Sequence, residues 1–224
     1  MSVLVIAPHP DDEAIGCGGI IALRVESGER VCVAFLTSGE LGLKHLPHDE
    51  AWRTREGEAE AAARVLGLAQ LYFLRQPDWL LGDNIPEASA ALRPVLETER
   101  PREIYVPHTG DWHPDHKASL PILLAALRVP GEAASGPPSL TPHSSLLATQ
   151  TPLLRTYEVW TPLSEYAHVE DISAVIARKL AAVRCYKSQL QGFRYDRAAR
   201  GLAQYRGALA GRCRYAEVFG NSEF

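Results

Sequence analysis

Two apolar runs of strand length, the first of them uninterrupted, constrain the fold of this chain more than any other feature. The first is VLVIA at 3–7, and the second is RVCVAFLTS at 30–38. About twenty helix-compatible residues, ending in ESG at 26–28, separate them. A run without polar alternation is typical of a strand buried on both faces, and such strands occur mainly in parallel sheets covered by helices. The pattern therefore predicts a right-handed β–α–β unit at the start of the chain.

The alternation of strand-like and helix-like segments continues along the chain. We expect strands at 71–74, 103–107 and 155–160 and helices at 52–67, 86–99 and 172–190, the second of these interrupted at Pro94. The Ser-, Thr- and Pro-rich stretch 129–152 predicts a long surface loop, and the tail from 191 shows no clear pattern. This order predicts an α/β protein, a Rossmann-like three-layer sandwich with a mostly parallel sheet, and one domain over 1–224.

Composition and charge argue against several classes of protein. The 224 residues carry a formal net charge of −4 with scattered Lys and Arg, so neither nucleic acid nor an anionic membrane is an expected partner. The apolar start has no basic residues and lacks the length of a signal peptide or a membrane span, which predicts a cytoplasmic protein. The four cysteines lie far apart without a C-x-x-C pair, so we expect neither a disulfide framework nor a thiolate zinc site.

Two polar clusters follow two of the predicted strands. HPDDE at 9–13 comes directly after the first strand, and HPDH at 113–116 comes after the 103–107 strand. The carboxyl ends of parallel strands meet at one edge of a sheet, where ligands bind. The prolines of both clusters stiffen their turns and suit a first helical position. We therefore expect the two clusters to meet in space.

The side chains of these clusters suit a catalytic metal. Two imidazoles and one carboxylate leave a fourth position open on tetrahedral zinc, and a water there has its pKa lowered to about 7. A spare carboxylate in either cluster can take the proton of that water. Each cluster alone has an ordinary explanation, because His-x-x-His is common on helix surfaces and acidic residues favour helix N-termini. Together they favour a site for zinc or another divalent metal.

The same residues carry a resemblance to a known family. APHPDDEAIGCGGIIA at 7–22, with HPDH, resembles the PIG-L/LmbE-like family of zinc-dependent N-deacetylases that act on N-acetylglucosamine-type substrates. Weaker similarity is found in TSGELG (37–42), FLRQPDW (73–79), YKSQ (186–189) and YAEVF (215–219). The resemblance implies a metal-dependent amide hydrolase that releases acetate and a free amine from an amino sugar or its conjugate. It is also compatible with a homo-oligomer.

The resemblance further implies roles for individual residues. The zinc ligands of the family match His9, Asp12 and His116. Asp11 matches the general base that activates the attacking water. His113 matches the residue that steadies the oxyanion or protonates the leaving amine, and Asp115 would orient His113 as a hydrogen-bonded carboxylate.

Three further residues are candidates for substrate binding, each with a competing structural explanation. Arg55 could reach a substrate hydroxyl, or it could pair with a nearby acid such as Glu58 on the same helix. Asp78 could hydrogen-bond a sugar or serve as a turn carboxylate. Trp112 could form a pocket wall for a sugar face, although a half-buried tryptophan needs no such role.

Two explanations are possible for each of the remaining polar and glycine residues of the first motif. Glu13 is either a helix-capping acid or a functional residue. The glycines of GCGG at 16–19 allow either close packing of a helix against the sheet or a backbone approach to substrate. Their G-x-G-G spacing differs from the dinucleotide-binding pattern G-x-G-x-x-G, which argues against a nucleotide-binding module. A metal-binding protein without catalysis is the other alternative, but structural zinc sites are commonly closed by cysteines, and neither cluster has a cysteine close to its ligands.

Overall fold

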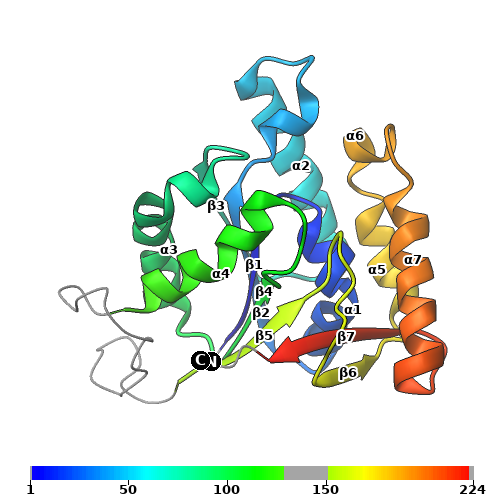
Figure 1. Cartoon of the computed structure of the whole chain (residues 1–224). Helices are drawn as coiled ribbons and strands as arrows, with labels where there is room; N and C mark the ends of the chain where they lie inside the picture. Colours follow the sequence, from blue (N-terminus) through cyan, green and yellow to red (C-terminus); the bar gives the residue numbers. More distant parts are fainter. Residues whose placement is uncertain (1, 129–150, 222–224) are drawn as a thin grey trace.

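The central sheet has seven strands in the order β3-β2-β1-β4-β5-β7-β6 (Figure 1). This computed structural model describes residues 2–128 and 151–221. The strands are β1 (Ser2–Ala7), β2 (Arg30–Thr37), β3 (Gln70–Gln76), β4 (Glu103–Pro107), β5 (Leu153–Tyr157), β6 (His168–Asp171) and β7 (Ala216–Asn221). The first five run parallel, whereas β7 is antiparallel to its neighbours β5 and β6. The predicted mostly parallel sheet is confirmed.

Helices cover both faces of this sheet (Figure 1). One side carries α1 (Asp12–Glu26), α2 (His48–Leu66), α5 (Ile176–Val183), α6 (Lys187–Leu190) and α7 (Tyr195–Arg206), and the other carries α3 (Ile85–Glu99) and α4 (Pro114–Leu127). Three short helical turns join them: η1 (Glu40–Leu43), η2 (Leu81–Asp83) and η3 (Gly207–Gly211). Among the described residues, none of the helices combines the length and the apolar character that a bilayer crossing requires.

The continuous apolar character of β1 follows from its two buried faces. Val3 and Val5 belong to the core between the sheet and α1, α2 and α5. Leu4 and Ile6 point the other way, into the core beneath α3 and α4. Successive side chains of a strand point to opposite faces, so a strand between two cores requires apolar residues at every position. The three-layer prediction made from VLVIA is therefore correct.

Several predicted boundaries differ from the observed ones. The 172–190 helix is broken: α5 ends at Val183, α6 begins at Lys187, and Tyr186 between them is only 1% exposed. α3 continues through Pro94. Pro94 has no N–H to donate to the carbonyl of Ala90, but both residues lie on the exposed side of the helix, where water can bind that carbonyl. The strand expected at 155–160 spans Leu153–Tyr157. The loop predicted at 129–152 lies outside the described residues except for its last two.

The glycines of α1 allow close packing, which was one of the two explanations offered for them. A Cβ built on Gly16 would lie 2.3 Å from Cδ2 of Tyr157, and one on Gly19 would lie 2.5 Å from Cγ2 of Ile172. Both distances are shorter than any ordinary contact, so these positions require glycine. The close approach fixes the N-terminus of α1, which carries Asp11 and Asp12, at the carboxyl edge of the sheet.

Candidate active site

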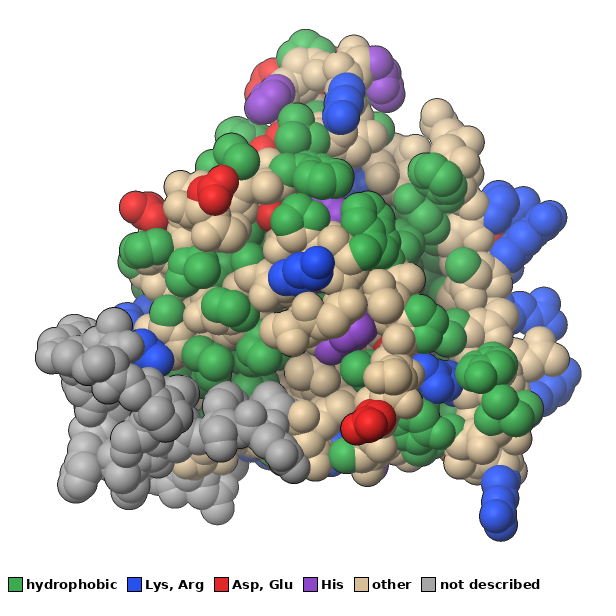
Figure 2. Space-filling view, in the orientation of Figure 1, with side chains coloured by type: hydrophobic (Ala, Val, Ile, Leu, Met, Phe, Trp, Pro, Cys, Tyr) green, Lys and Arg blue, Asp and Glu red, His purple; other side chains and the backbone are tan. Residues whose placement is uncertain are grey.

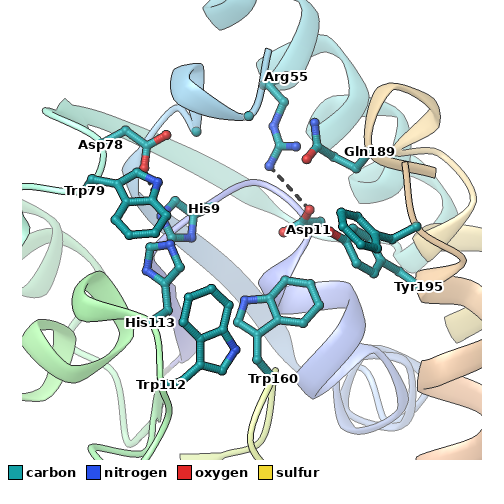
Figure 3. Close-up of a pocket in the computed structure, with 13 residues that line it drawn as sticks. His9, Asp11, Arg55, Asp78, Trp79, Trp112, His113, Trp160, Gln189 and Tyr195 are labelled. Carbon is teal, nitrogen blue, oxygen red and sulfur yellow. Dashed lines mark hydrogen bonds and ion pairs between the residues drawn. The ribbon is translucent and has the colours of Figure 1, made fainter. Parts of the chain in front are cut away.

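A cavity of about 370 Å³ opens at the carboxyl ends of the parallel strands (Figure 3). Six of the nine predicted site residues line it: His9, Asp11, Arg55, Asp78, Trp112 and His113. The other three, Asp12, Asp115 and His116, lie behind them and are fully buried. The structure thus brings together two clusters that are about a hundred residues apart in the chain.

Asp12 joins the two histidines predicted as metal ligands. Its Oδ2 lies 3.1 Å from Nδ1 of His9 and 3.2 Å from Nε2 of His116. Burial alone would raise the pKa of Asp12, but the two imidazoles outweigh burial and hold the pKa well below its usual range. Burial would lower the pKa of His116, but Asp12 and Asp111 raise it to about 9. The three side chains therefore form one tightly coupled group.

A divalent metal ion fits this donor set. Oδ1 of Asp12 and Nε2 of His116 are buried, and neither makes a well-oriented hydrogen bond within the described residues. Buried polar atoms normally find a partner, so a coordinated cation would satisfy them. Ligand atoms of His9, His113 and His116 also lie within 4.8 Å of one another, so His113 lies directly beside the predicted ligands. Imidazole and carboxylate donors suit zinc.

Asp115 orients His9, which corrects the prediction that it orients His113. Its Oδ2 lies 3.1 Å from Nε2 of His9 and also accepts the backbone N–H of Trp79 at 2.8 Å. The hydrogen bond that Asp115 makes to His113 comes from its backbone N–H and not from its carboxylate. The carboxylate turns towards His9 because the N–H groups of the segment after β3, at Trp79 and Leu81, bind both of its oxygens.

Asp111 faces the other side of His116 and was not predicted from the sequence. Its Oδ2 lies 3.5 Å from Nδ1 of His116 and accepts the backbone N–H groups of Trp160 and Thr161. Metal-binding histidines commonly present their second nitrogen to a carboxylate. The only signal in the sequence was an aspartate two residues before the HPDH motif, in a turn where aspartate is common.

Asp11 has an unusual backbone conformation. Its φ of 127° and ψ of −29° are rare for an L-residue, and such conformations cost about 1–3 kcal/mol. The side chain makes no capping hydrogen bond to α1; instead Oδ2 lies 3.3 Å from Nη2 of Arg55 (Figure 3). Burial raises the pKa of Asp11 to about 7, against the lowering effect of Arg55. A carboxyl group with a pKa near neutrality is well suited to general-base catalysis.

His113 is held as a neutral hydrogen-bond donor. It is the N-cap of α4, where its Nδ1 accepts the N–H of Asp115 at 3.2 Å. Burial lowers the pKa of His113 to about 4, together with the charges of His9 and His116. Because Nδ1 accepts a hydrogen bond, the neutral ring carries its proton on Nε2. The ring is thus arranged to donate a hydrogen bond to a ligand.

Arg55 is buried beside the cavity with unused donors. Its Nη2 donates to the carbonyl of Pro10 and faces Asp11, while Nε and Nη1 have no hydrogen-bond partner in the described part of the chain. It does not pair with Glu58, whose carboxylate accepts hydrogen bonds from Ser188. The explanation that Arg55 pairs with Glu58 on the same helix is therefore wrong. A ligand hydroxyl or carbonyl in the cavity could accept from the free donors.

Asp78 connects two loops at the cavity wall. Its Oδ2 accepts the backbone N–H of Leu41 at 2.9 Å, and its own N–H donates to Glu40. Its Oδ1 lies 3.2 Å from Nε2 of His9. Burial would raise the pKa of Asp78, but His9 outweighs burial and lowers it. Asp78 therefore does bind the backbone of neighbouring loops, as a turn carboxylate would, and its Oδ1 still faces the site.

Aromatic rings surround the cavity (Figure 3). Trp112 is 57% exposed and Trp79 is 47% exposed, and both rings pack against His113. Trp160 and Tyr195 close the opposite side, with ring centroids 4.8 Å apart. Figure 2 shows hydrophobic side chains gathered on this face between α4 and α6. Of these rings only Trp112 was predicted from the sequence, because the others come from segments far apart in the chain.

Comparison with known proteins decides the family. The family model described as PIG-L, GlcNAc-PI de-N-acetylase, matches residues 4–127, which include both clusters. The chain belongs to the PIG-L family. The diacetylchitobiose deacetylase of Thermococcus kodakarensis is 31% identical to this PIG-L protein over 228 residues, covering 96% of this chain and 80% of the relative.

Solved structures agree with the PIG-L assignment. The conserved protein TT1542 of Thermus thermophilus superimposes with a TM-score of 0.79 at 32% identity, covering all of this chain and 95% of the other. The N,N'-diacetylchitobiose deacetylase of Pyrococcus horikoshii, complexed with an inhibitor, has a TM-score of 0.80 at 26% identity, covering 97% and 82%. Both the fold and the resemblance read from the two sequence clusters are confirmed.

Proposed function

We propose that this PIG-L protein removes the N-acetyl group of a glucosamine-type amino sugar or its conjugate, giving acetate and a free amine. One observation carries the proposal: Asp11, with a pKa of about 7, lies beside the coupled group of His9, Asp12 and His116 at the base of an aromatic cavity. The names of the deacetylase relatives support this substrate class. The reaction is hydrolysis of an amide bond.

His9, Asp12 and His116 would hold the metal, which we propose to be Zn²⁺. When bound, zinc polarises the amide carbonyl and makes water a stronger nucleophile at neutral pH. The carboxylates of Asp115 and Asp111 fix the ring orientations of His9 and His116, respectively. Another divalent metal with the same preference for nitrogen and oxygen donors could occupy this site.

Asp11 and His113 supply the proton chemistry. Asp11 accepts the proton of the attacking water, because its carboxylate lines the cavity. His113 donates a hydrogen bond from Nε2 to the carbonyl oxygen of the acetyl group as negative charge develops there. Protonated Asp11 then returns this proton to the amide nitrogen, and the C–N bond breaks to give acetate and the free amine.

The cavity wall provides contacts for the sugar. The unused Nε and Nη1 of Arg55 can donate to a hydroxyl group, and Oδ1 of Asp78, which has no well-oriented hydrogen bond in the described residues, can accept from one. The exposed ring of Trp112 offers an apolar surface for a sugar face. We propose these three residues as the substrate-binding set.

The alternative functions find less support. The glycines of GCGG pack against Tyr157 and Ile172, so they are not free to cradle a nucleotide. A purely structural metal site would not require Asp11 to face the cavity in a strained conformation. A homo-oligomer, a cytoplasmic location and the treatment of 1–224 as one domain stay predictions.

The proposal is tested by measuring acetate release from a panel of N-acetylglucosaminyl compounds, with Asp11→Asn as the matched variant. An amide cannot accept the proton of the water, so this variant should bind metal normally and lose about 10²- to 10⁴-fold in turnover. Absence of acetate release from every N-acetyl sugar by the zinc-loaded wild type would contradict the proposed function. Wild-type turnover in Asp11→Asn would exclude Asp11 as the base.

A further inference from the structure

The strained backbone of Asp11 is held at three points. Its carbonyl accepts the N–H groups of Ala14 and Ile15 at 3.1 and 2.9 Å, which begin α1. Its carboxylate faces Arg55. Its N–H donates to Oε2 of Glu13 at 3.1 Å. The third contact is supplied by a side chain that the proposed mechanism does not use.

Glu13 is buried and fully engaged. Its exposed fraction is 0%, whereas an acid in the first turn of a helix usually faces solvent. Its second oxygen, Oε1, accepts the hydroxyl of Tyr186 at 2.5 Å. Tyr186 lies in the break between α5 and α6, 173 residues away along the chain. The break in the predicted helix therefore places the Tyr186 side chain against Glu13.

A capping role alone explains only part of this arrangement. An acid near a helix start can reach back to the N–H of the N-cap residue, as Glu13 does. A solvent-exposed side chain would be sufficient for that contact. Here the carboxylate is fixed from the other side by a buried tyrosine, so its position is determined by the packing of α5 against α1.

We propose that Glu13 and Tyr186 are positioning residues for Asp11. Tyr186 holds Glu13, Glu13 holds the backbone N–H of Asp11, and this chain of hydrogen bonds directs the Asp11 carboxylate into the cavity. The inference rests on the proposed function, because it assigns Asp11 the role of the base. It links the YKSQ segment of the C-terminal part to the first metal-binding motif.

The main variants are Glu13→Ala and Glu13→Gln. Removal of the carboxylate should lower kcat about 10- to 100-fold, because small displacements of a catalytic group are costly, with KM within about twofold and zinc content unchanged. Glutamine should restore most of the rate, since its amide oxygen can accept from Asp11 and its amide N–H can donate to Tyr186. Tyr186→Phe should give an intermediate loss of kcat.

A matched control separates positioning from general stability. Tyr105 also donates its hydroxyl to a buried glutamate, Glu103, at 2.9 Å, but this pair lies towards the start of β4 and away from the cavity. Tyr105→Phe should lower the melting temperature about as much as Tyr186→Phe and leave kcat unchanged. Equal losses of kcat in the two variants would overturn the proposal.

A double-mutant cycle tests whether Glu13 acts through Asp11. In an Asp11→Ala background, Glu13→Ala should cause no further loss of residual activity. An additive loss would show that Glu13 acts by another route and would overturn the inference. If the zinc-loaded wild type releases no acetate at all, the proposed function fails instead.

Amide hydrogen exchange gives a readout independent of activity. In the metal-free protein the Asp11 amide should exchange slowly, and Glu13→Ala should accelerate it at least tenfold while Glu13→Gln does not. Exchange at Asp11 that is unaffected by Glu13→Ala would refute the proposed hydrogen bond.

Discussion

Replacement of Gly16 by alanine tests the close packing that positions the N-terminus of α1. The new Cβ would lie 2.3 Å from Cδ2 of Tyr157 and 2.6 Å from the carbonyl oxygen of Glu158. Tyr157 is fully buried and its hydroxyl donates to Ile6 at 2.8 Å, so the ring cannot turn aside without losing that bond. The Glu158 carbonyl belongs to the backbone. Relief of the clash therefore requires α1 to move away from the sheet.

The expected magnitude combines two opposing effects. Overpacking of a core costs about 1–3 kcal/mol, and the contact with a backbone atom places this site at the upper end. Alanine recovers about 1 kcal/mol relative to glycine within a helix. The net expectation is a loss of about 2 kcal/mol in the free energy of unfolding, or about 4–8 °C in melting temperature for a chain of this size.

Gly57→Ala is the matched control for this prediction. Gly57 is exposed on α2, and a Cβ there would meet no atom within 4 Å, so its replacement should stabilise the protein by about 0.5–1 kcal/mol. Urea denaturation of the two variants and the wild type measures both effects. Stability of Gly16→Ala equal to or above that of the wild type would refute the close packing of α1.

His116→Ala should bind markedly less zinc by metal analysis, and full occupancy would exclude His116 as a ligand. Trp112→Ala should raise KM severalfold with little change in kcat, since we propose that its ring contacts the sugar and not the reacting amide; a loss confined to kcat would contradict that role. Hydrogen bonds from Arg30 lower the pKa of Glu99 from 4.5 to about 2, so the stabilisation by this carboxylate is complete above about pH 4.5 and is lost as the pH falls towards 2. Because Arg30 is half-exposed, solvent weakens its interaction with Glu99, and Glu99→Gln should lower the free energy of unfolding by only about 1–2 kcal/mol at pH 7. The difference in stability between the variant and the wild type should become smaller in acid, which urea titrations at several pH values can measure. A difference that does not depend on pH would contradict the assignment to Glu99.

The sequence predicted those parts of the fold that depend on local patterns. The central positions of β1 and β2 are all apolar because both faces of these strands are buried, and this pattern is visible in the sequence of each strand alone. The two polar clusters follow β1 and β4, which are neighbours in the sheet, so their meeting at one edge followed from the parallel arrangement.

The remaining features depend on contacts between distant segments. The 172–190 segment has a helical pattern, but Tyr186 in its break donates a hydrogen bond to Glu13, far away in the chain. The carboxylate of Asp115 turns to His9 because backbone N–H groups after β3 bind it, which the HPDH motif cannot reveal. The aromatic wall combines single residues from separate loops, such as Trp79 and Trp160.

The most direct test of the account is the metal dependence of acetate release. The wild type would be stripped with a chelator, dialysed, and assayed on N-acetylglucosaminyl substrates before and after addition of one equivalent of Zn²⁺, with Asp12→Ala treated in parallel. The account predicts that stripping abolishes acetate release, that one equivalent restores it in the wild type, and that Asp12→Ala is not restored. Full activity in the stripped protein, or restoration of Asp12→Ala to the wild-type rate, would contradict it.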